Sequence, residues 1–238
     1  MSISVAMAVF NGEKYIKEQI HSILPQLSPE DELIVSCDKS SDNTLEIIKN
    51  IAFVDGRVNL IEGPGQGAVK NFENAILNCN NEYIFLSDQD DSWLPNKVNC
   101  VLKEFQKTNA DLILHDAIIV DENLQELHGS FFKKRNSKPG ILNNIIKNSY
   151  IGCCMAFKKD LRKKFLPFPR SIPMHDQWIG LIAEKYGKVS FLSKKLIKYR
   201  RHNNTATAIT HSNVKNMIIW RITLIKEFLF YKKSNTNN

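Results

Sequence analysis

Long apolar runs and paired cysteines are missing from this 238-residue chain. No stretch of 18 apolar residues occurs, so we expect no membrane-spanning helix. The apolar residues 3–10 are too short a segment for a signal peptide, and they end in a turn. The five cysteines show no CxxC and no repeated spacing, which favours reduced thiols. These absences predict a cytoplasmic protein.

Two familiar nucleotide-binding signatures are missing as well. The glycine-rich loop 63–67 is followed by Lys70, but its spacing is not GxGxxG, and neither Gly-Lys-Ser nor Gly-Lys-Thr follows. A Rossmann dehydrogenase and a P-loop kinase are therefore both disfavoured. We find no helix-turn-helix, zinc-finger or aromatic RNA-binding signature, and expect no nucleic-acid partner.

Acidic residues are scarce in the second half of the chain. Residues 1–119 hold 9 Lys and Arg against 18 Asp and Glu, a balance of −9. Residues 120–238 hold 23 against 7, a balance of +16. The basic half suits an anionic leaving group, an anionic acceptor or a membrane surface.

Strands and helices alternate regularly in the first part of the chain. Apolar runs bounded by turn residues predict strands at 2–10, 33–35, 58–61 and 83–86, and one-sided apolar patterns predict helices at 13–24, 43–51 and 69–79. This order implies an α/β fold with a mostly parallel, doubly wound sheet and helices on both faces. Later we expect helices at 96–108, 140–148, 177–186 and 213–231, and strands at 112–115, 117–120, 150–157, 189–192 and 196–199.

Three carboxylates end the fourth expected strand. Asp88, Asp90 and Asp91 repel one another, which costs stability unless a cation lies between them. Acidic oxygens suit a hard cation such as Mg²⁺ or Mn²⁺, and ligands of open α/β sheets bind outside the carboxyl ends of strands. The pattern predicts a site for a metal and a phosphate-bearing substrate, with a solvated acidic turn as the alternative.

Two other strand ends should reach the same edge of the sheet. The first strand ends at Phe10-Asn11 and the second at Asp38, so both should meet Asp88 in one crevice. The Asp38 carboxylate suits a base N–H or a ribose hydroxyl, although a turn or capping acid has the same pattern. The glycine loop allows the backbone to come close to a ligand.

Two polar spots lie in the basic half. Asp176 is the only acid between Leu161 and Ala183 and precedes an apolar helix. It can act as a general base beside a substrate hydroxyl or cap the helix, and the two roles are compatible. Arg200 and its neighbour Arg201 can fork onto phosphate oxygens, and His202 can bind metal, phosphate or neither.

Taken together, these residues resemble the family-2 glycosyltransferases, which have the GT-A fold, and most closely their bacterial rhamnosyltransferase-like branch. The similar segments follow the family order over about residues 2–204: VAMAVFNGEKYIKEQIHSIL, ELIVSCDKSSDNT, GQGAVKNFENA, FLSDQDDSWLPNKV, MHDQW and YRRHNN. The specific part is DQDDxWxPxK followed by HDxW and YRxHxN. Phe10 stands where many relatives carry Tyr, and Cys37 replaces an acid of the usual DDGS.

The resemblance implies a role for each matching residue. Asp38 would hold the nucleobase, Asp88 and Asp90 would be the DXD pair, and Asp176 would be the base of an inverting reaction. The implied nucleotide-sugar contacts are Ala8, Phe10, Asn11, Glu13, Asp38, Gly67, Lys70, Asn71, Asp88, Gln89 and Arg200. The implied metal ligands are Asp90 and His202, and the implied acceptor contacts are Trp93, His175 and Trp178.

The implied activity is metal-dependent transfer of a sugar, with rhamnose as a candidate, from a dTDP- or UDP-linked donor. The acceptor would be a hydroxyl of a growing cell-surface glycan or lipid-linked acceptor, and the cofactor Mn²⁺ or Mg²⁺. A departing diphosphate needs a cation to neutralise it, and inversion needs one base and no enzymic nucleophile.

Two alternatives stay open. A sugar-phosphate nucleotidyltransferase usually needs an N-terminal Gly-rich loop with Arg and Lys, which residues 6–14 lack. A non-catalytic nucleotide-sugar-binding module could lose the base, and the presence of Asp90 together with Asp176 argues against it.

The domain division implied by the resemblance places a catalytic domain at 1–205. Residues 1–119 would bind the nucleotide sugar, 120–205 would bind the acceptor, and 206–238 would form an amphipathic helix and a polar tail. The stretch 213–233 combines a wide apolar arc with basic residues. Such a helix can lie in a membrane interface or pack on the domain with its basic face in water. The first alternative predicts peripheral contact with the inner face of the cytoplasmic membrane.

Overall fold

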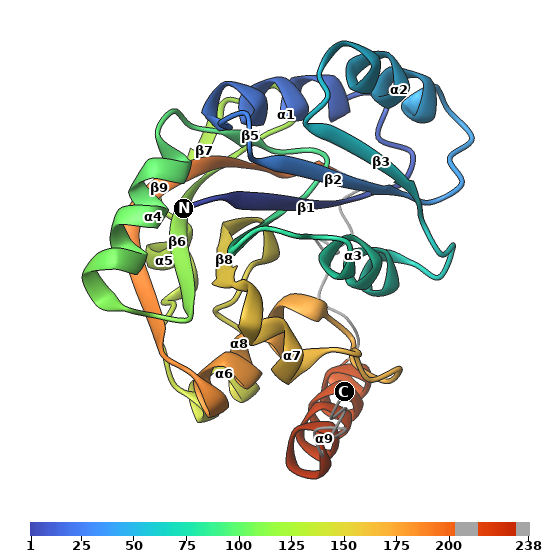
Figure 1. Ribbon diagram of the computed structural model, residues 1–238. Helices are drawn as coiled ribbons and strands as arrows, with labels where there is room; N and C mark the ends of the chain where they lie inside the picture. The colour runs from blue at the N-terminus through green and yellow to red at the C-terminus, as the bar shows by residue number, and fades with distance from the viewer. Residues whose placement is uncertain (203–213, 232–238) are drawn as a thin grey trace.

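One mixed sheet runs through the protein (Figure 1). The computed structural model describes residues 1–202 and 214–231. Within them the strands follow the order β3-β2-β1-β4-β8-β6-β9-β5, and β7 pairs with β6. The strands are β1 (Ile3–Val9), β2 (Glu32–Cys37), β3 (Val58–Glu62), β4 (Tyr83–Ser87), β5 (Ser92–Trp93), β6 (Leu112–Val120), β7 (Glu126–His128), β8 (Met155–Lys158) and β9 (Val189–Arg200).

The sheet is mostly parallel, as expected. β1 pairs in parallel with β2 and with β4, and β2 pairs in parallel with β3. β8 runs antiparallel between β4 and β6, and β9 is parallel to β6. The α/β class is therefore confirmed, and the antiparallel strands β5, β7 and β8 are additions that a purely alternating pattern does not predict.

The register of the parallel strands brings their carboxyl ends to one edge. Val9 at the end of β1 lies opposite Cys37, and Met7 lies opposite Ser87 at the end of β4. The chain segments that follow these strands therefore emerge side by side. This confirms that Phe10-Asn11, Asp38 and Asp88 share one edge of the sheet.

Helices cover both faces of the sheet. In Figure 1, α1 and α2 lie above the strands, whereas α3, α7 and α8 lie below them. The apolar stripe of α1, Ile16, Ile20 and Ile23, is completely buried, which follows from its helical spacing. The helices are α1 (Ile16–Ile23), α2 (Thr44–Val54), α3 (Ala68–Leu77), α4 (Lys97–Thr108), α5 (Phe131–Arg135), α6 (Ile141–Ile146), α7 (Arg162–Phe165), α8 (His175–Tyr186) and α9 (Val214–Phe230).

Three expectations for the second half of the chain were wrong in detail. The expected strands 112–115 and 117–120 form the single strand β6. The expected strand 150–157 starts only at Met155, because the preceding residues Gly152–Cys154 form a 3-10 turn. These three residues are buried, so the segment is apolar like a strand although it is not paired in the sheet. The expected strands 189–192 and 196–199 form the single strand β9, which follows β6 through two register shifts.

The last helix matches the expected range within one residue at each end. Leu224 and Phe228 bury its inner side, and the Tyr231 ring packs edge-on to Trp178 at a centroid distance of 4.9 Å. No helix in the described ranges is long and apolar enough to cross a membrane. The expected polar tail 234–238, and the start of the expected C-terminal segment at 206–213, lie outside the described residues.

Candidate functional site

The ends of β1 and β4 are tied together by an amide side chain. Gln89 accepts a hydrogen bond from the backbone N–H of Phe10 at 2.9 Å and donates to the Phe10 carbonyl at 3.0 Å. This leaves the Phe10 ring 55% exposed at the sheet edge. Asn11 turns the chain with φ +47° and accepts from the Ser41 backbone N–H at 2.9 Å. The geometry offers an aromatic face at the position expected for a nucleobase.

Asp38 is held in place by the glycine-rich loop. Its Oδ1 accepts from the Gly65 backbone N–H at 2.8 Å, and its own N–H donates to the Val9 carbonyl at 2.9 Å. A Cβ at Gly63 would collide with the Asp38 carboxylate and with Asn71, so this position has room only for glycine. Asn71 donates to the Val9 carbonyl, but its buried Oδ1 has no hydrogen-bond partner within the described structure.

Four other residues expected to contact the nucleotide sugar lie on the elements that form this edge, and the two with charged side chains, Glu13 and Lys70, have partners in the protein. Glu13 accepts two hydrogen bonds from Asn43 at the start of α2, at 3.0 and 2.8 Å. Lys70 forms an ion pair with Glu73 and donates to a carbonyl at 3.3 Å. Gly67 precedes α3 with φ +83°, and Ala8 is half-buried on β1. These placements give Glu13 and Lys70 structural partners and leave their substrate contacts as predictions.

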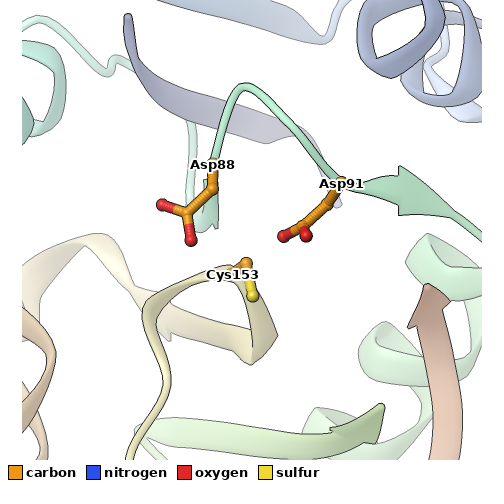
Figure 2. Close-up of side chains that lie close together, drawn as sticks. All are labelled: Asp88, Asp91 and Cys153. Atoms are coloured by element: carbon orange, nitrogen blue, oxygen red, sulfur yellow. The ribbon is translucent and has the colours of Figure 1, made fainter. Parts of the chain in front are cut away.

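The loop after β4 gathers acidic groups above a buried thiol. Figure 2 shows Asp88 and Asp91 pointing from this loop toward Cys153, and one ligand atom from each lies within 4.8 Å of the others. Burial, followed by the charges of Asp91, Asp90 and Asp176, raises the pKa of Asp88 well above its ordinary value. Burial and the charge of Asp90 raise the pKa of Asp91 to about 7. The cluster therefore resists ionisation unless positive charge is added.

Asp90 is paired with the distant His202. The carboxylate Oδ2 lies 2.8 Å from Nε2 of the imidazole, and both side chains are partly exposed. The Tyr15 ring of the segment before α1 lies against His202 with a centroid distance of 4.9 Å. The structure thus joins the acidic loop to a residue 112 positions away.

The side chain of Arg200 is buried and bonded to protein groups. Its side chain donates from Nε to the Asp90 carbonyl at 2.6 Å, from Nη1 to the Glu122 carbonyl at 2.5 Å, and from Nη2 to the Glu18 carboxylate at 2.8 Å. Its backbone N–H donates to Asp91 at 2.9 Å, and the residue is 2% exposed. This placement argues against a bidentate phosphate contact by Arg200 and favours a role in holding the acidic loop.

Asp176 lies in the first turn of α8, two residues after the N-cap Met174. Its carboxylate accepts from the Gln177 backbone N–H at 2.6 Å, and it is 6% exposed. Burial raises its pKa to about 6, although backbone N–H groups act in the opposite direction. Because its charge also raises the pKa of Asp88, the two carboxylates share one electrostatic environment. The helix begins two residues before the expected Gln177, so the alternative role of Asp176 as the N-cap is wrong, because Met174 is at that position.

The three residues expected to contact an acceptor are buried. The His175 ring stacks on Phe72 at 4.1 Å, and burial lowers its pKa to about 3. Trp93 is 4% exposed, and Trp178 is fully buried with its indole N–H donating to the Phe165 carbonyl. Both indoles belong to the hydrophobic core. This placement argues against acceptor contact by either indole.

Three residues at this edge were missed from the sequence. Gln19 is completely buried and donates to Ser87 at 2.7 Å and to the Asp88 carbonyl at 2.9 Å. Lys97 is also fully buried; its ammonium donates to the Cys153 carbonyl at 2.8 Å and lies 3.9 Å from the centre of the Trp93 ring. Arg135 is close enough to Asp176 to affect its pKa. Of these three residues, only Gln19 could have been noticed in the sequence, because it is a polar residue on the apolar stripe of the helix expected at 13–24.

The donor set fits a hard divalent cation. Carboxylate oxygens and an imidazole nitrogen are suitable ligands for Mn²⁺ or Mg²⁺, and Asp90 and His202 already converge. The buried Asp91 Oδ2 has no hydrogen-bond partner among the described residues. Burial raises the pKa of the Cys153 thiol, so this sulfur stays protonated and is the poorest ligand nearby.

Comparison with known proteins agrees with this arrangement. Residues 4–166 match the sequence model of Glycosyl transferase family 2. A UDP-Glc:alpha-D-GlcNAc-diphosphoundecaprenol beta-1,3-glucosyltransferase, WfgD, of Escherichia coli is 27% identical over 90% of this chain and 82% of its own length. The dTDP-rhamnosyl transferase RfbG of Shigella flexneri is 26% identical over 83% of this chain and 72% of its own.

Solved structures show the same fold. TarS of S. aureus, crystallised as residues 1–349 with UDP-GlcNAc, superposes with a TM-score of 0.77 at 20% identity, covering 97% of this chain and 67% of that one. Glucosyl-3-phosphoglycerate synthase of Mycobacterium tuberculosis, crystallised with Mn²⁺ and UDP, has a TM-score of 0.59 at 16% identity. It covers 98% of this chain and 80% of its own. At these identities the likeness establishes the fold.

Proposed function

The chain belongs to glycosyl transferase family 2, and from that membership we propose an inverting, metal-dependent transfer of a sugar from a dTDP- or UDP-linked donor. The observation that carries the proposal is the meeting of Asp176 with the acidic loop. Asp176 borders Gly152, where an added Cβ would lie 3.8 Å from the Asp176 Cβ. The next residue, Cys153, has its sulfur within 4.8 Å of ligand atoms of Asp88 and Asp91, and the charge of Asp176 contributes to raising the Asp88 pKa. The enzyme is a glycosyltransferase that uses a nucleotide sugar; the stereochemistry, the metal and the sugar are the proposed part.

The donor nucleotide is proposed to bind at the ends of β1 and β2. The exposed Phe10 ring supports stacking on the base, and Asp38, anchored by Gly65, supports a hydrogen bond to a base N–H. Asn71 has an unpartnered buried oxygen beside them. TarS, crystallised with UDP-GlcNAc, is consistent with a uridine or thymidine donor.

The proposed reaction is a direct displacement. Asp176 accepts the proton of an acceptor hydroxyl, and the acceptor oxygen forms a bond to the anomeric carbon. The bond from that carbon to the diphosphate oxygen breaks, and the nucleoside diphosphate leaves with the electron pair. The raised pKa of about 6 suits this role, because a base with a pKa near the working pH is ionised and still basic.

A divalent cation is proposed at Asp90 and His202, beside Asp88. Such a cation would neutralise charge that develops on the departing diphosphate. Two residues hold the proposed ligands in position: Arg200 donates to the backbone carbonyl of Asp90, and Tyr15 packs on His202. The bound Mn²⁺ of the Mycobacterium synthase gives this proposal further support.

The acceptor is proposed to be a lipid-linked glycan of the cell surface, and the enzyme to act at the cytoplasmic side of the membrane. WfgD is named for an acceptor on diphosphoundecaprenol, and RfbG for transfer of rhamnose from dTDP. Rhamnose therefore remains one candidate sugar beside glucose. Peripheral membrane contact by the last helix belongs to the same proposal.

The test is donor hydrolysis and transfer screened across UDP-, dTDP- and GDP-sugars, each with Mn²⁺, Mg²⁺ or EDTA. We expect cation-dependent release of UDP or dTDP from one sugar and no release with EDTA. Release of pyrophosphate from a nucleoside triphosphate and a sugar phosphate would instead indicate a nucleotidyltransferase. Tight nucleotide-sugar binding with no turnover for any acceptor would indicate a binding module.

A further inference from the structure

The helix α9 presents apolar side chains to solvent as well as to the domain. Its inner side chains, Leu224 and Phe228, are 1% and 7% exposed. The outer face consists of Ile219, Ile222, Ile225, Leu229 and Phe230, which are 36–74% exposed. The helical period of 3.6 residues places these five on the half of the helix away from the domain, interrupted by Lys226. A helix in contact only with water on this side would carry polar residues here.

A second helix extends this apolar surface. Leu142 and Ile146 of α6 are 77% and 66% exposed and lie four residues apart, on one side of the helix. Arg221 of α9 donates to the Ile146 carbonyl at 2.7 Å, which joins the two helices. Both helices lie at the lower edge of the molecule in Figure 1, on the side of the sheet opposite α1 and α2.

The charges around this surface are almost all positive. Residues 131–147, which include α5 and α6, contain five Lys and Arg and no Asp or Glu. Lys138, Lys147 and Lys226 are exposed. Two acids lie nearby, Glu227, which accepts from Ser171, and Glu184, which accepts from Tyr150, and the basic residues outnumber them. Two copies of this chain meeting here would bring like charges together, whereas an anionic lipid surface would neutralise them.

The surface is connected to the candidate base. Gln177, the residue after Asp176, donates from its side-chain amide to the Asn144 carbonyl of α6 at 2.7 Å. The helix that carries Leu142 and Ile146 is therefore held against the first turn of α8. An acceptor presented at this surface would approach the protein on the side of Asp176.

We propose that the outer face of α9 and the exposed residues of α6 dock on an anionic bilayer. The apolar side chains enter the interface between head groups and acyl chains, and the surrounding lysines and arginines contact lipid phosphates. Only the purpose of this docking, which is to hold a lipid-linked acceptor near Asp176, rests on the proposed function. The docking itself is tested without any sugar.

The experiment is flotation of the full-length protein with vesicles of phosphatidylcholine alone and with roughly 30% phosphatidylglycerol, at low salt and at about 0.5 M salt. The test variant is Ile222→Ser with Leu229→Ser. The matched control is Phe53→Ser with Val54→Ser on α2, whose side chains are 93% and 84% exposed on the other side of the sheet. A second test pair, Lys147→Glu with Lys226→Glu, changes charge and leaves the apolar side chains intact.

We expect wild type and control to float with anionic vesicles, and the test variant to bind at least roughly tenfold more weakly. The charge pair should lose binding to a similar degree, and salt should weaken the binding of wild type. Equal binding by test variant and control, or no flotation of wild type at low salt, would overturn the proposal. So would a dimer in sedimentation velocity that only the serine test variant abolishes, because the partner would then be a second copy.

Failure of this proposal and failure of the proposed function are distinguishable. Vesicle binding without sugar transfer would leave the docking surface and remove the glycosyltransfer mechanism. Transfer to a short soluble acceptor without vesicle binding would leave the mechanism and remove the surface.

Discussion

Replacing Asp176 with Asn separates a catalytic base from a helix-stabilising acid. Asn keeps the size of the side chain and can still accept from the Gln177 backbone N–H, but it cannot take a proton from an acceptor hydroxyl. Loss of a general base lowers turnover by roughly 10²–10⁴-fold, which corresponds to about 3–5 kcal/mol in the activation barrier. Donor binding should stay near wild type, because the carboxylate acts on the acceptor.

The same substitution should make the protein more stable. Burial raises the pKa of Asp176 from 3.8 to about 6, so keeping the carboxylate ionised at pH 7.5 costs the folded state about 3 kcal/mol. Asn removes that cost. After allowance for imperfect packing we expect a gain of about 1–3 kcal/mol, or roughly 2–10 °C in Tm for a chain of this length.

The pH dependence of this gain has a defined sign. The folded protein binds the Asp176 proton more tightly than the unfolded chain, so the wild type loses stability as the pH rises from about 4 through 6. The stability difference between Asn variant and wild type should therefore be largest above pH 7. Between pH 7.5 and pH 4.5 it should shrink by about 2 kcal/mol.

The assay pairs steady-state release of the nucleoside diphosphate with thermal unfolding by circular dichroism in EDTA at pH 7.5 and 4.5. The control is Asp111→Asn, because Asp111 precedes β6 at the opposite end of the sheet and accepts from the Lys188 N–H at 2.8 Å. The control should lose stability and keep its turnover number. A lower Tm for the Asp176 variant with turnover within tenfold of wild type would refute the reasoning and leave Asp176 as a helix-stabilising acid.

Three further predictions concern the same site. Asp90→Asn should remove most metal-dependent activity and weaken nucleoside diphosphate binding, and calorimetry with and without Mn²⁺ would contradict this if variant and wild type gave equal affinities in both conditions. Arg200→Met should lower Mn²⁺ affinity roughly tenfold and the free energy of unfolding by about 2–5 kcal/mol, because Glu18 and the Asp90 carbonyl lose their donor, and Arg200→Lys should restore part of both. A loss of nucleotide affinity in EDTA with unchanged Mn²⁺ affinity would instead place Arg200 on the phosphates. The kcat/KM of wild type should fall tenfold per pH unit below about pH 6, and the residual activity of Asp176→Asn should not, in a pH-rate profile at saturating cation.

Local patterns in the sequence determined the α/β fold and the position of its functional edge. Apolar runs such as Tyr83–Leu86 and the one-sided apolar stripe of α1 are patterns of a few neighbouring residues. Their spacing can therefore be recognised in the sequence without knowing which segments they pack against. Polar residues that directly follow such runs, as Asn11, Asp38 and Asp88 do, then fall at one edge because parallel strands share a direction. The α/β class and the functional edge were accessible by this route, whereas the GT-A fold and the family came from the resemblance of motifs such as DQDDSW and MHDQW.

Only the tertiary structure decided which polar groups remain available to a substrate. Arginine and tryptophan are common at ligand-binding positions. Here, however, Arg200 donates its hydrogen bonds to carbonyls of two loops, and Trp93 is enclosed by the hydrophobic core. The pairing of Asp90 with His202 spans 112 residues and depends on the register of β9, which no local period specifies. The raised pKa of Asp176 likewise depends on burial by distant segments. Burial and partner choice are properties of the packed chain, because they depend on which side chains from remote segments meet, and a residue's neighbours in the sequence carry no record of them.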